Sequence, residues 1–438
     1  MPIFHFDPNF FSKRPQITLK QKFYGQSFKA LNTVNSREFQ ECFNHLDGKF
    51  DQFCDEWGKV CKDHVFDRPW KHVLRETGEN ESDTSQLYKD AVASVETQAR
   101  AVYVEEDLMN CSQDEFLQLM MEQGCFILQV ALCSLGGPKP LGYPPDDPLF
   151  GEKRWNYKLI RFLVNRYLFC IKNQIPLVVL EVLMKQSFFQ NVLKLGKWKR
   201  PNDLAGMVLY DFLVEPMLDG YFQSRRHPAI TLLHALWLKV TGSDSHGTNH
   251  IKEDVGHLYT NLSTVNSAKE LQAAGITFKN YEGFDMRGIK FKKRMLDAHL
   301  YLPYINMEPH NIALFEGLIH FERDANLNIN QREVSAYITF MSELIRSRDD
   351  VRVLVTGGIL DSDLEYEQQL PNTLSKLVSQ FDRLMVGNIR NFASIRGEIR
   401  RYVRPSMRTK IMNLVVIGLV LTLVQTIYTV LSYHHPHH

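Results

Sequence analysis

The chain has 438 residues, of which 44% are hydrophobic and 23% are charged, as in an ordinary globular protein. Its 51 Lys and Arg residues balance 50 Asp and Glu residues, and the net charge of +1 excludes a chain-wide attraction to nucleic acid or to an anionic membrane, so that only local patches can matter. The seven cysteines all precede residue 171 and none forms a C-x-x-C pair. We therefore expect reduced, packed thiols in a reducing compartment.

The first part of the chain is predicted to be helical. Large apolar residues at spacings of three and four predict an amphipathic helix over 39–65, and a second helix is expected over 83–103. A third helix, over 111–135, opens with Ser112 and Glu115 at the spacing of a capping box.

A Pro- and Gly-rich segment, 136–148, forbids a helix and is interpreted as a surface connection. Farther along, "KNQIPLVVLEVL" (172–183) interrupts a helical pattern. Pro176 lacks an N–H group and disfavours the helical conformation of the preceding residue, so the pattern predicts a helix, a break and a new helix with Pro176 in its first turn. Asn173 or Gln174 can satisfy backbone groups that the break leaves open, and we interpret these three residues as a structural hinge.

Two more helices, 203–218 and 227–240, precede a polar loop over 242–257. The loop contains three histidines, but no helical pattern fixes their faces and no cysteine accompanies them. The sequence therefore predicts no zinc site, and no other metal site.

The pattern changes after residue 265. Ser267 and Glu270 form a second capping box, and Gly275 ends the short helix that follows it. Alternating or clustered apolar residues then predict short strands between 276 and 305. A basic run among these strands is interpreted as a solvated face, with a phosphate or lipid-headgroup contact as the alternative; its members are Lys290, Lys292, Lys293 and Arg294.

Helices are expected again over 310–324 and 332–347, and Gly357-Gly358 is expected to mark a turn or a helix end. The sequence contains no serine-hydrolase elbow, zinc-protease motif, Walker loop, kinase signature or dinucleotide fingerprint. Its adjacent carboxylates would point to different faces of a helix and suggest no acid–base pair. We therefore predict no enzymatic activity and no cofactor.

Residues 411–431 contain no charge and include 13 Ile, Leu and Val residues. As a helix they would span about 31 Å, which matches the hydrocarbon core of a bilayer. We predict a single transmembrane helix whose partner is the lipid bilayer. Basic residues precede this span and none follows it, which places the body in the cytosol; they are Arg396, Arg400, Arg401, Arg404, Arg408 and Lys410.

One face of the predicted span carries its small and polar residues: Gly418, Thr422, Gln425, Thr426 and Thr429. Gly418 and Thr422 form a small-x-x-x-small pair that lets another helix approach, and Gln425 can hydrogen-bond across a helix pair. We therefore predict a dimer or a partner helix in the membrane. The alternative is that scattered threonines are tolerated in any single span.

Several segments together resemble a plant family known as domain of unknown function 247. They are "MMEQGCFIL" (120–128), "NQIPLVVLEVL" (173–183), "SAKELQAAGITFK" (267–279), "YLPYINMEPHNIALFEGLIHFE" (301–322) and "YITFMSELIRSRDDVRVLVTGGIL" (337–360), together with the terminal span. The early segment 13–25 keeps little of the corresponding family block.

The resemblance implies a mostly helical, membrane-associated plant protein of undetermined biochemistry. Some grass members of the family are linked to pollen self-incompatibility, which would make the body a recognition surface. We expect a mostly α fold: a divergent segment over 1–64, a large helical domain with a small β-strand insert over 65–404, and a transmembrane helix over 411–431. The function expected is a non-enzymatic interaction module with an unknown protein partner; the alternative is an enzyme of unrecognised type.

Overall fold

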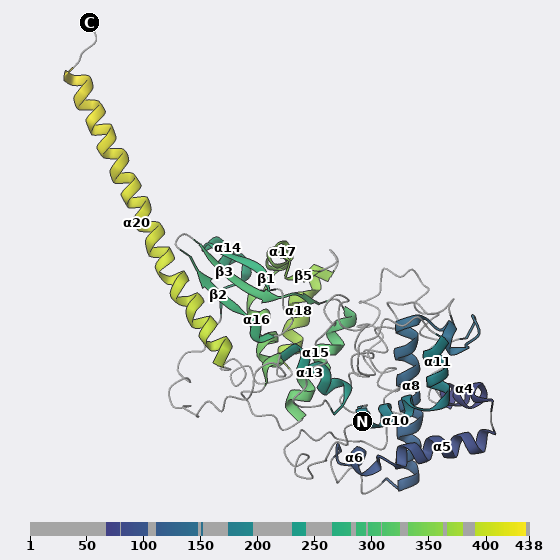
Figure 1. Cartoon of the computed structure of the whole chain (residues 1–438). Coiled ribbons are helices and arrows are strands. Elements are labelled where there is room, and N and C mark those ends of the chain that lie inside the picture. The colour runs from purple at the N-terminus through teal and green to yellow at the C-terminus, as the bar shows by residue number, and fades with distance from the viewer. Residues whose placement is uncertain are drawn as a thin grey trace. The chain divides into compact units, whose positions relative to one another are not determined.

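The computed structural model describes residues 67–78, 80–103, 111–147, 150–151, 174–195, 230–241, 265–281, 286–294, 297–307, 309–324, 332–361, 366–379 and 390–434. This part of the chain is mostly helical and contains a small three-stranded sheet, as the sequence predicted (Figure 1). Several sequence predictions lie outside the described residues: the divergent segment 1–64 with its helix at 39–65, the helix before the break at Pro176, the helix at 203–218, the histidine loop at 242–257, and the role of Asn173.

The described residues fall in two compact units, and two stretches of chain form each unit. Unit 1 draws on Met1–Ile251 and Asn306–Val334, and unit 2 on Lys252–Ile305 and Ser335–His438. The expectation of a single large helical domain over 65–404 stays a prediction.

Unit 1 is built from helices around α8. Its elements are α4 (Asp67–Thr77), α5 (Glu81–Ala93), α6 (Glu96–Arg100), α8 (Gln113–Gly136), the 3-10 turn η2 (Lys139–Leu141), α10 (Leu177–Met184), α11 (Ser187–Leu195), α13 (Leu232–Thr241) and α15 (Pro309–Asp324). Helix α8 packs against α4, α5, α10 and η2, and α13 packs against α15.

The start of α8 confirms the first predicted capping box. The Ser112 hydroxyl accepts from the backbone N–H of Glu115, whose carboxylate accepts from the backbone N–H of Ser112 at 3.0 Å. The stretch Gln113–Cys133 is long and apolar enough to cross a membrane, but 78% of its most apolar window is buried inside the protein. It is therefore the core helix of unit 1.

The predicted helix over 83–103 is two helices, α5 and α6. The Ser94 hydroxyl donates to the Ala91 carbonyl at 2.6 Å, and the Val95 N–H donates to the Val92 carbonyl at 3.1 Å. These three-residue bonds tighten the last turn and compete with continuation of the helix.

Unit 2 combines helices with the small sheet. Its elements are α14 (Ala268–Ala273), β1 (Ile276–Tyr281), the 3-10 turn η6 (Met286–Gly288), β2 (Lys290–Lys293), β3 (Ala298–Pro303), α16 (Glu333–Leu344, in this unit from Ser335 on), α17 (Arg348–Thr356), α18 (Tyr366–Val378) and α20 (Arg390–His434). The two-residue strands β4 (Ile305–Asn306) and β5 (Leu360–Asp361) form a separate pair where the chain passes from unit 2 to unit 1.

The three strands expected between 276 and 305 are confirmed, in the order β1-β3-β2. Strand β3 lies in the centre, parallel to β1 and antiparallel to β2, and is almost wholly buried. Gly275 links α14 to β1 with φ +92°, a left-handed conformation that glycine adopts without a steric cost. Helix α14 packs against β1 and α20 against β2, so the two edge strands meet different helices.

Candidate functional site

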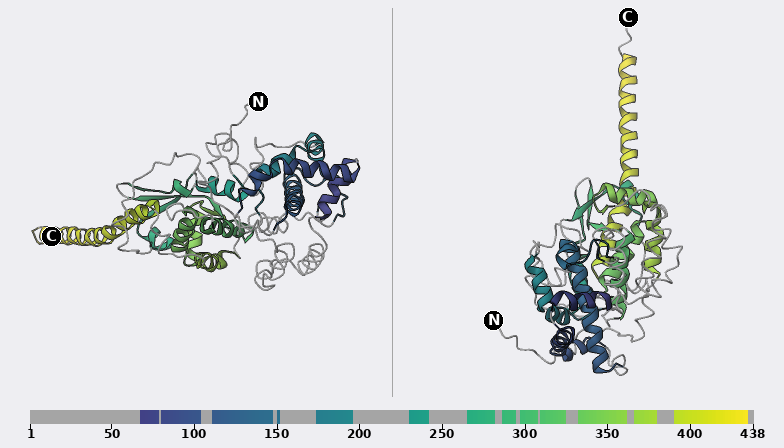
Figure 2. Two further views of the ribbon diagram at one scale, coloured as in Figure 1. Left: turned by 90° about the horizontal axis from the view of Figure 1, so that it is seen from below. Right: turned by 90° about the vertical axis from the view of Figure 1, so that its right-hand side faces the viewer.

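Helix α20 runs without a break over 45 residues, about 68 Å at the rise of an α-helix (Figure 1). Its part Val415–Leu431, which we call the apolar segment, is exposed throughout, and its large side chains range from 50% exposed at Val416 to 77% at Tyr428. In Figure 2 this part extends beyond the other described elements of unit 2. A helix segment that is mostly apolar and exposed on every side within its own unit favours an apolar environment supplied from elsewhere.

The other end of α20 is part of the core of unit 2. Phe392, Ile395 and Ile399 are 2–7% exposed and follow the three- and four-residue spacing of a buried helix face. One turn farther on, the ring of Tyr402 lies 5.8 Å from that of Phe291 on β2, in an edge-to-face contact. The helix that begins in the core of unit 2 therefore continues without a break into the apolar segment.

Arg396 lies on the same buried face, and it fixes α20 to α16. Its Nε and Nη2 donate to the two carboxylate oxygens of Glu343 at 3.0 and 3.1 Å, and its guanidinium lies 5.4 Å above the centre of the Phe340 ring. Bidentate pairing of this kind is strong and directional. The sequence placed Arg396 with the membrane-flanking residues, and this was wrong because the side chain is 6% exposed.

The remaining basic residues of the predicted flank lie farther along α20. Arg400 is half-buried, and Arg401 is exposed with its Nε donating to the Gly397 carbonyl. The last three follow between Tyr402 and the apolar segment; they are Arg404, Arg408 and Lys410. The basic residues of α20 are thus distributed along the helix between the core of unit 2 and the apolar segment.

Glu343 also connects α20 to the start of α14. Its carboxylate accepts a hydrogen bond from the backbone N–H of Val265 at 3.3 Å, and the guanidinium of Arg346 donates to the Val265 carbonyl. Val265 comes two residues before Ser267, the N-cap of α14. One carboxylate therefore binds α20 and the segment that leads into the sheet.

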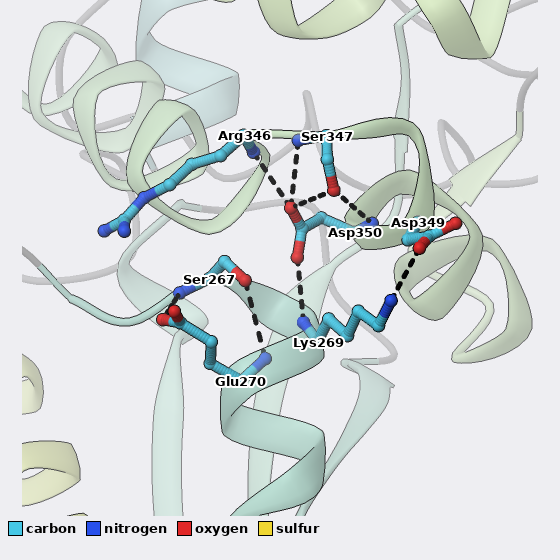
Figure 3. A network of polar contacts seen from close by, with 7 residues as sticks. All are labelled: Ser267, Lys269, Glu270, Arg346, Ser347, Asp349 and Asp350. Carbon is cyan, nitrogen blue, oxygen red and sulfur yellow. Dashed lines mark hydrogen bonds and ion pairs between the residues drawn. The ribbon is translucent and has the colours of Figure 1, made fainter.

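Figure 3 shows the polar cluster that follows, centred on Asp350, which is 1% exposed. One carboxylate oxygen accepts from the backbone N–H of Lys269 at 2.9 Å. The other accepts from the N–H groups of Arg346 and Ser347 and from the Ser347 hydroxyl, at 2.7–3.2 Å. Burial alone would raise the pKa of Asp350, but hydrogen bonds from Ser267 and these groups outweigh it and hold the pKa below its usual value. Asp350 therefore caps α17 and supports the first turn of α14 at once.

The rest of the cluster consists of local caps and one exposed ion pair. The carboxylate of Glu270 accepts from the Ser267 N–H at 3.0 Å, which confirms the second predicted capping box. Lys269 pairs with Asp349 at 2.6 Å on the surface. These polar atoms bind one another, and the described residues contain no group of three or more potential metal ligands. Chemically, the cluster is a helix-capping junction.

The predicted hinge is described from Gln174 onward. Gln174 is 2% exposed, its side-chain carbonyl accepts from the N–H of Leu233 at 2.9 Å, and its backbone carbonyl accepts from the Tyr103 hydroxyl at 2.8 Å. Gln174 thus supplies an acceptor to the first turn of α13, a helix that starts 58 residues later (232 − 174). Its action as a hinge stays a prediction.

Pro176 lies one position before the helix, as the N-cap of α10, and not in the first turn as predicted. The reason is a short antiparallel bridge between Pro176 and Thr231, in which the Leu177 N–H donates to the Ile230 carbonyl at 2.8 Å. This bridge requires an extended conformation at Pro176, whose ψ is 134°.

The predicted association face lies on the exposed apolar segment. The hydroxyls of Thr422, Thr426 and Thr429 donate to the carbonyls four residues earlier, so these groups are satisfied within the helix. A Cβ at Gly418 would meet nothing within 4 Å, which leaves room for another helix. Association through this face, including a hydrogen bond from Gln425, stays a prediction.

Sequence reasoning missed the junction of α20 with unit 2. The signal was available in the spacing of Phe392, Ile395 and Ile399, but the charges around them suggested a membrane flank. The partner Glu343 lies 53 residues from Arg396, and no local pattern could pair them.

Comparison with known families agrees with the segments noted above. The family described as "Plant protein of unknown function", domain of unknown function 247, matches residues 67–433. No curated protein and no solved structure matches the chain. The family match covers most of both units and the whole apolar segment, and the chain therefore belongs to the plant domain-of-unknown-function 247 family.

Proposed function

We propose that this protein is a single-pass membrane protein, anchored by the C-terminal part of α20, whose cytosolic body is a non-enzymatic interaction or recognition module. The observation that carries the proposal is the apolar segment, Val415–Leu431, which is exposed on all sides and continuous with a helix packed in unit 2. Leu, Ile and Val each favour insertion by about 0.3–0.6 kcal/mol, and most residues of this segment are of these types.

The proposal of an interaction module is supported by the hydrogen bonds of the buried carboxylates among the described residues. The carboxylates of Asp350, Glu343 and Glu322 accept hydrogen bonds from helix ends or from buried side chains of their own unit. They therefore hold the fold together, and none of these three carboxylates is left to act on a substrate. Recognition of the self-incompatibility type is one specific form of this proposal.

Alkaline extraction of membranes tests the anchor. Leu421→Arg combined with Val424→Arg adds two charges to the apolar segment, each of which opposes insertion by about 2.5–3.5 kcal/mol at the centre of a span. We expect the wild-type chain to stay in the membrane pellet and the double variant to move to the supernatant.

The matched control adds the same charges to exposed leucines of unit 1, Leu87→Arg with Leu195→Arg, which are 49% and 76% exposed. This control should remain in the pellet. Release of the wild-type chain, or equal release of both variants, would overturn the anchor.

The functional class needs a separate experiment. The full chain, in its membrane, is incubated with plant metabolite extracts and, in parallel, crosslinked to neighbouring proteins. We expect one reproducible protein partner and no change in any metabolite. Turnover that depends on the folded chain would replace the proposal with an enzyme.

A further inference from the structure

We propose that the basic residues of β2, the edge strand that packs against α20, bind the anionic headgroups of the membrane into which α20 inserts. The inference rests on the proposed anchor, and it assigns a second contact between unit 2 and the bilayer. We call this contact region the basic surface; it comprises the exposed residues Lys290, Lys292, Lys293 and Arg294.

The first observation is the place of β2 in the sheet. It is an edge strand, paired only with β3, and it packs against α20. Phe291 of β2 contacts the ring of Tyr402 on α20. The three lysines of the strand are all exposed. The amines of Lys290 and Lys292 lie 5.2 Å from the ring centres of Tyr281 and Tyr301, which hold these side chains against the sheet.

The second observation is the distance along α20. Tyr402, beside β2, is nine residues before position 411, where the uncharged stretch begins, which is roughly 14 Å along the helix axis. The headgroup layer occupies about 5–7 Å outside the hydrocarbon core, and charges act over about 8 Å more at physiological salt. Strand β2 is therefore within reach of the headgroups whenever the apolar segment is inserted.

The third observation is the charge of the segment between them. The sequence contains no Asp or Glu after Glu398, so the basic residues of α20 from Arg404 to Lys410 have no acidic residue within four positions of them along the helix. Each Lys or Arg near an anionic surface strengthens binding by about fivefold. Lysines on an edge strand also prevent pairing with other sheets, and that role alone would need no second basic stretch beside them.

A lipid-dependent footprint tests the inference on the full chain. The protein is inserted in vesicles of phosphatidylcholine alone or with 30% phosphatidylserine, and the rate of lysine acetylation is measured by mass spectrometry. We expect acetylation of Lys290, Lys292 and Lys293 to slow by about threefold or more in the anionic vesicles and to recover in 0.5 M NaCl. Lys279, exposed on the opposite edge strand β1, is the internal control and should not change.

A charge-removing variant provides the second readout. Discs cut from the mixed vesicles with a polymer carry the lipids around the protein, and wild type should be enriched in phosphatidylserine over the bulk composition. The variant K290Q/K292Q/K293Q should lose a large part of this enrichment, whereas K279Q should keep it.

Three results would overturn the inference: equal acetylation in the two lipids, equal enrichment in the two variants, or protection by inorganic phosphate in neutral vesicles as strong as that by anionic lipid. The last result would assign the surface to a free anion. Alkaline extraction of every sample separates the two proposals, because a chain that stays in the pellet without lysine protection contradicts the basic surface alone.

Discussion

Asp350 joins two helix N-termini of unit 2, and we expect its loss to be costly. Asp350→Ala removes acceptors from α17 and α14, and each lost cap costs about 0.5–2 kcal/mol. We predict a fall of about 1–4 kcal/mol in the free energy of unfolding of the full chain in lipid discs. Asp349→Ala, one residue away in an exposed ion pair, should change it little; equal effects of the two variants would show that Asp350 is not the junction.

The pH dependence of this contribution follows from the lowered pKa of Asp350. A carboxylate whose folded-state pKa is below its usual 3.8 contributes stability that is complete above that pH and is lost as the pH falls through the folded-state pKa. The difference between wild type and Asp350→Ala should therefore be constant from pH 7 to 5. The difference should shrink only as the pH falls below 3.8, and a difference that stays constant there would mean that the folded-state pKa is not lowered.

His72 in unit 1 predicts acid sensitivity at a higher pH than Asp350 does. Its Nε2 lies 2.7 Å from the Leu141 carbonyl and its ring stacks on Tyr143, and burial lowers the pKa of the imidazole below 6.5. The unfolded chain therefore binds a proton that the folded chain does not, and stability should fall as the pH drops below 6.5 towards the folded-state pKa. His72→Gln should flatten this slope in thermal unfolding; an unchanged slope would assign the sensitivity to other groups.

At the scale of elements, Gly124 lets α10 pack directly on α8. A Cβ at this position would strike Cδ1 of Leu183, so Gly124→Ala should overpack the contact at a cost of about 1–3 kcal/mol, of which the gain of about 1 kcal/mol for alanine in a helix offsets only a part. Gly397→Ala is the matched control, because a Cβ there meets nothing within 4 Å and alanine favours a helix by about 1 kcal/mol.

A double-mutant cycle identifies the contact itself. In a chain that already carries Leu183→Ala, the added Gly124→Ala should cost much less, since the atom it strikes is gone. Additive losses in thermal unfolding would rule out the clash as the cause.

The elements that sequence reasoning found are those with local signals. The capping boxes at Ser112 and Ser267 and the alternation over 276–303 depend on residues within a few positions of one another, and all three were correct. The acceptor role of Gln174 on α13 and the pair Arg396–Glu343 connect residues more than 50 positions apart, and these were not predicted. At the candidate site, the sequence therefore identified the apolar segment but not the way in which unit 2 holds it.

At the scale of the whole molecule, the chain leaves unit 1 and returns to it as α15. Glu322 on α15 accepts from the indole N–H of Trp237 at 3.0 Å and from the Val334 N–H at 2.8 Å, with its side chain fully buried. A chain that ends at Ile251 therefore lacks part of its core, and we predict that it binds the dye ANS and loses its near-ultraviolet circular dichroism. Joining residues 306–334 to this chain should restore the near-ultraviolet circular dichroism. A chain without 306–334 that keeps this signal and does not bind ANS would contradict the assignment of that segment to unit 1.

We propose that α20 carries unit 2 on the cytosolic side of a bilayer and places the apolar segment inside it. The most direct measurement is digestion of the full chain in sealed microsomes, with the protected peptides identified by mass spectrometry. We expect one protected peptide that begins within about two turns before residue 411 and contains all of Val415–Leu431. No peptide from unit 1 should be protected. Digestion of Val415–Leu431 together with the body, or protection of the body with a glycan on Asn261, would contradict it.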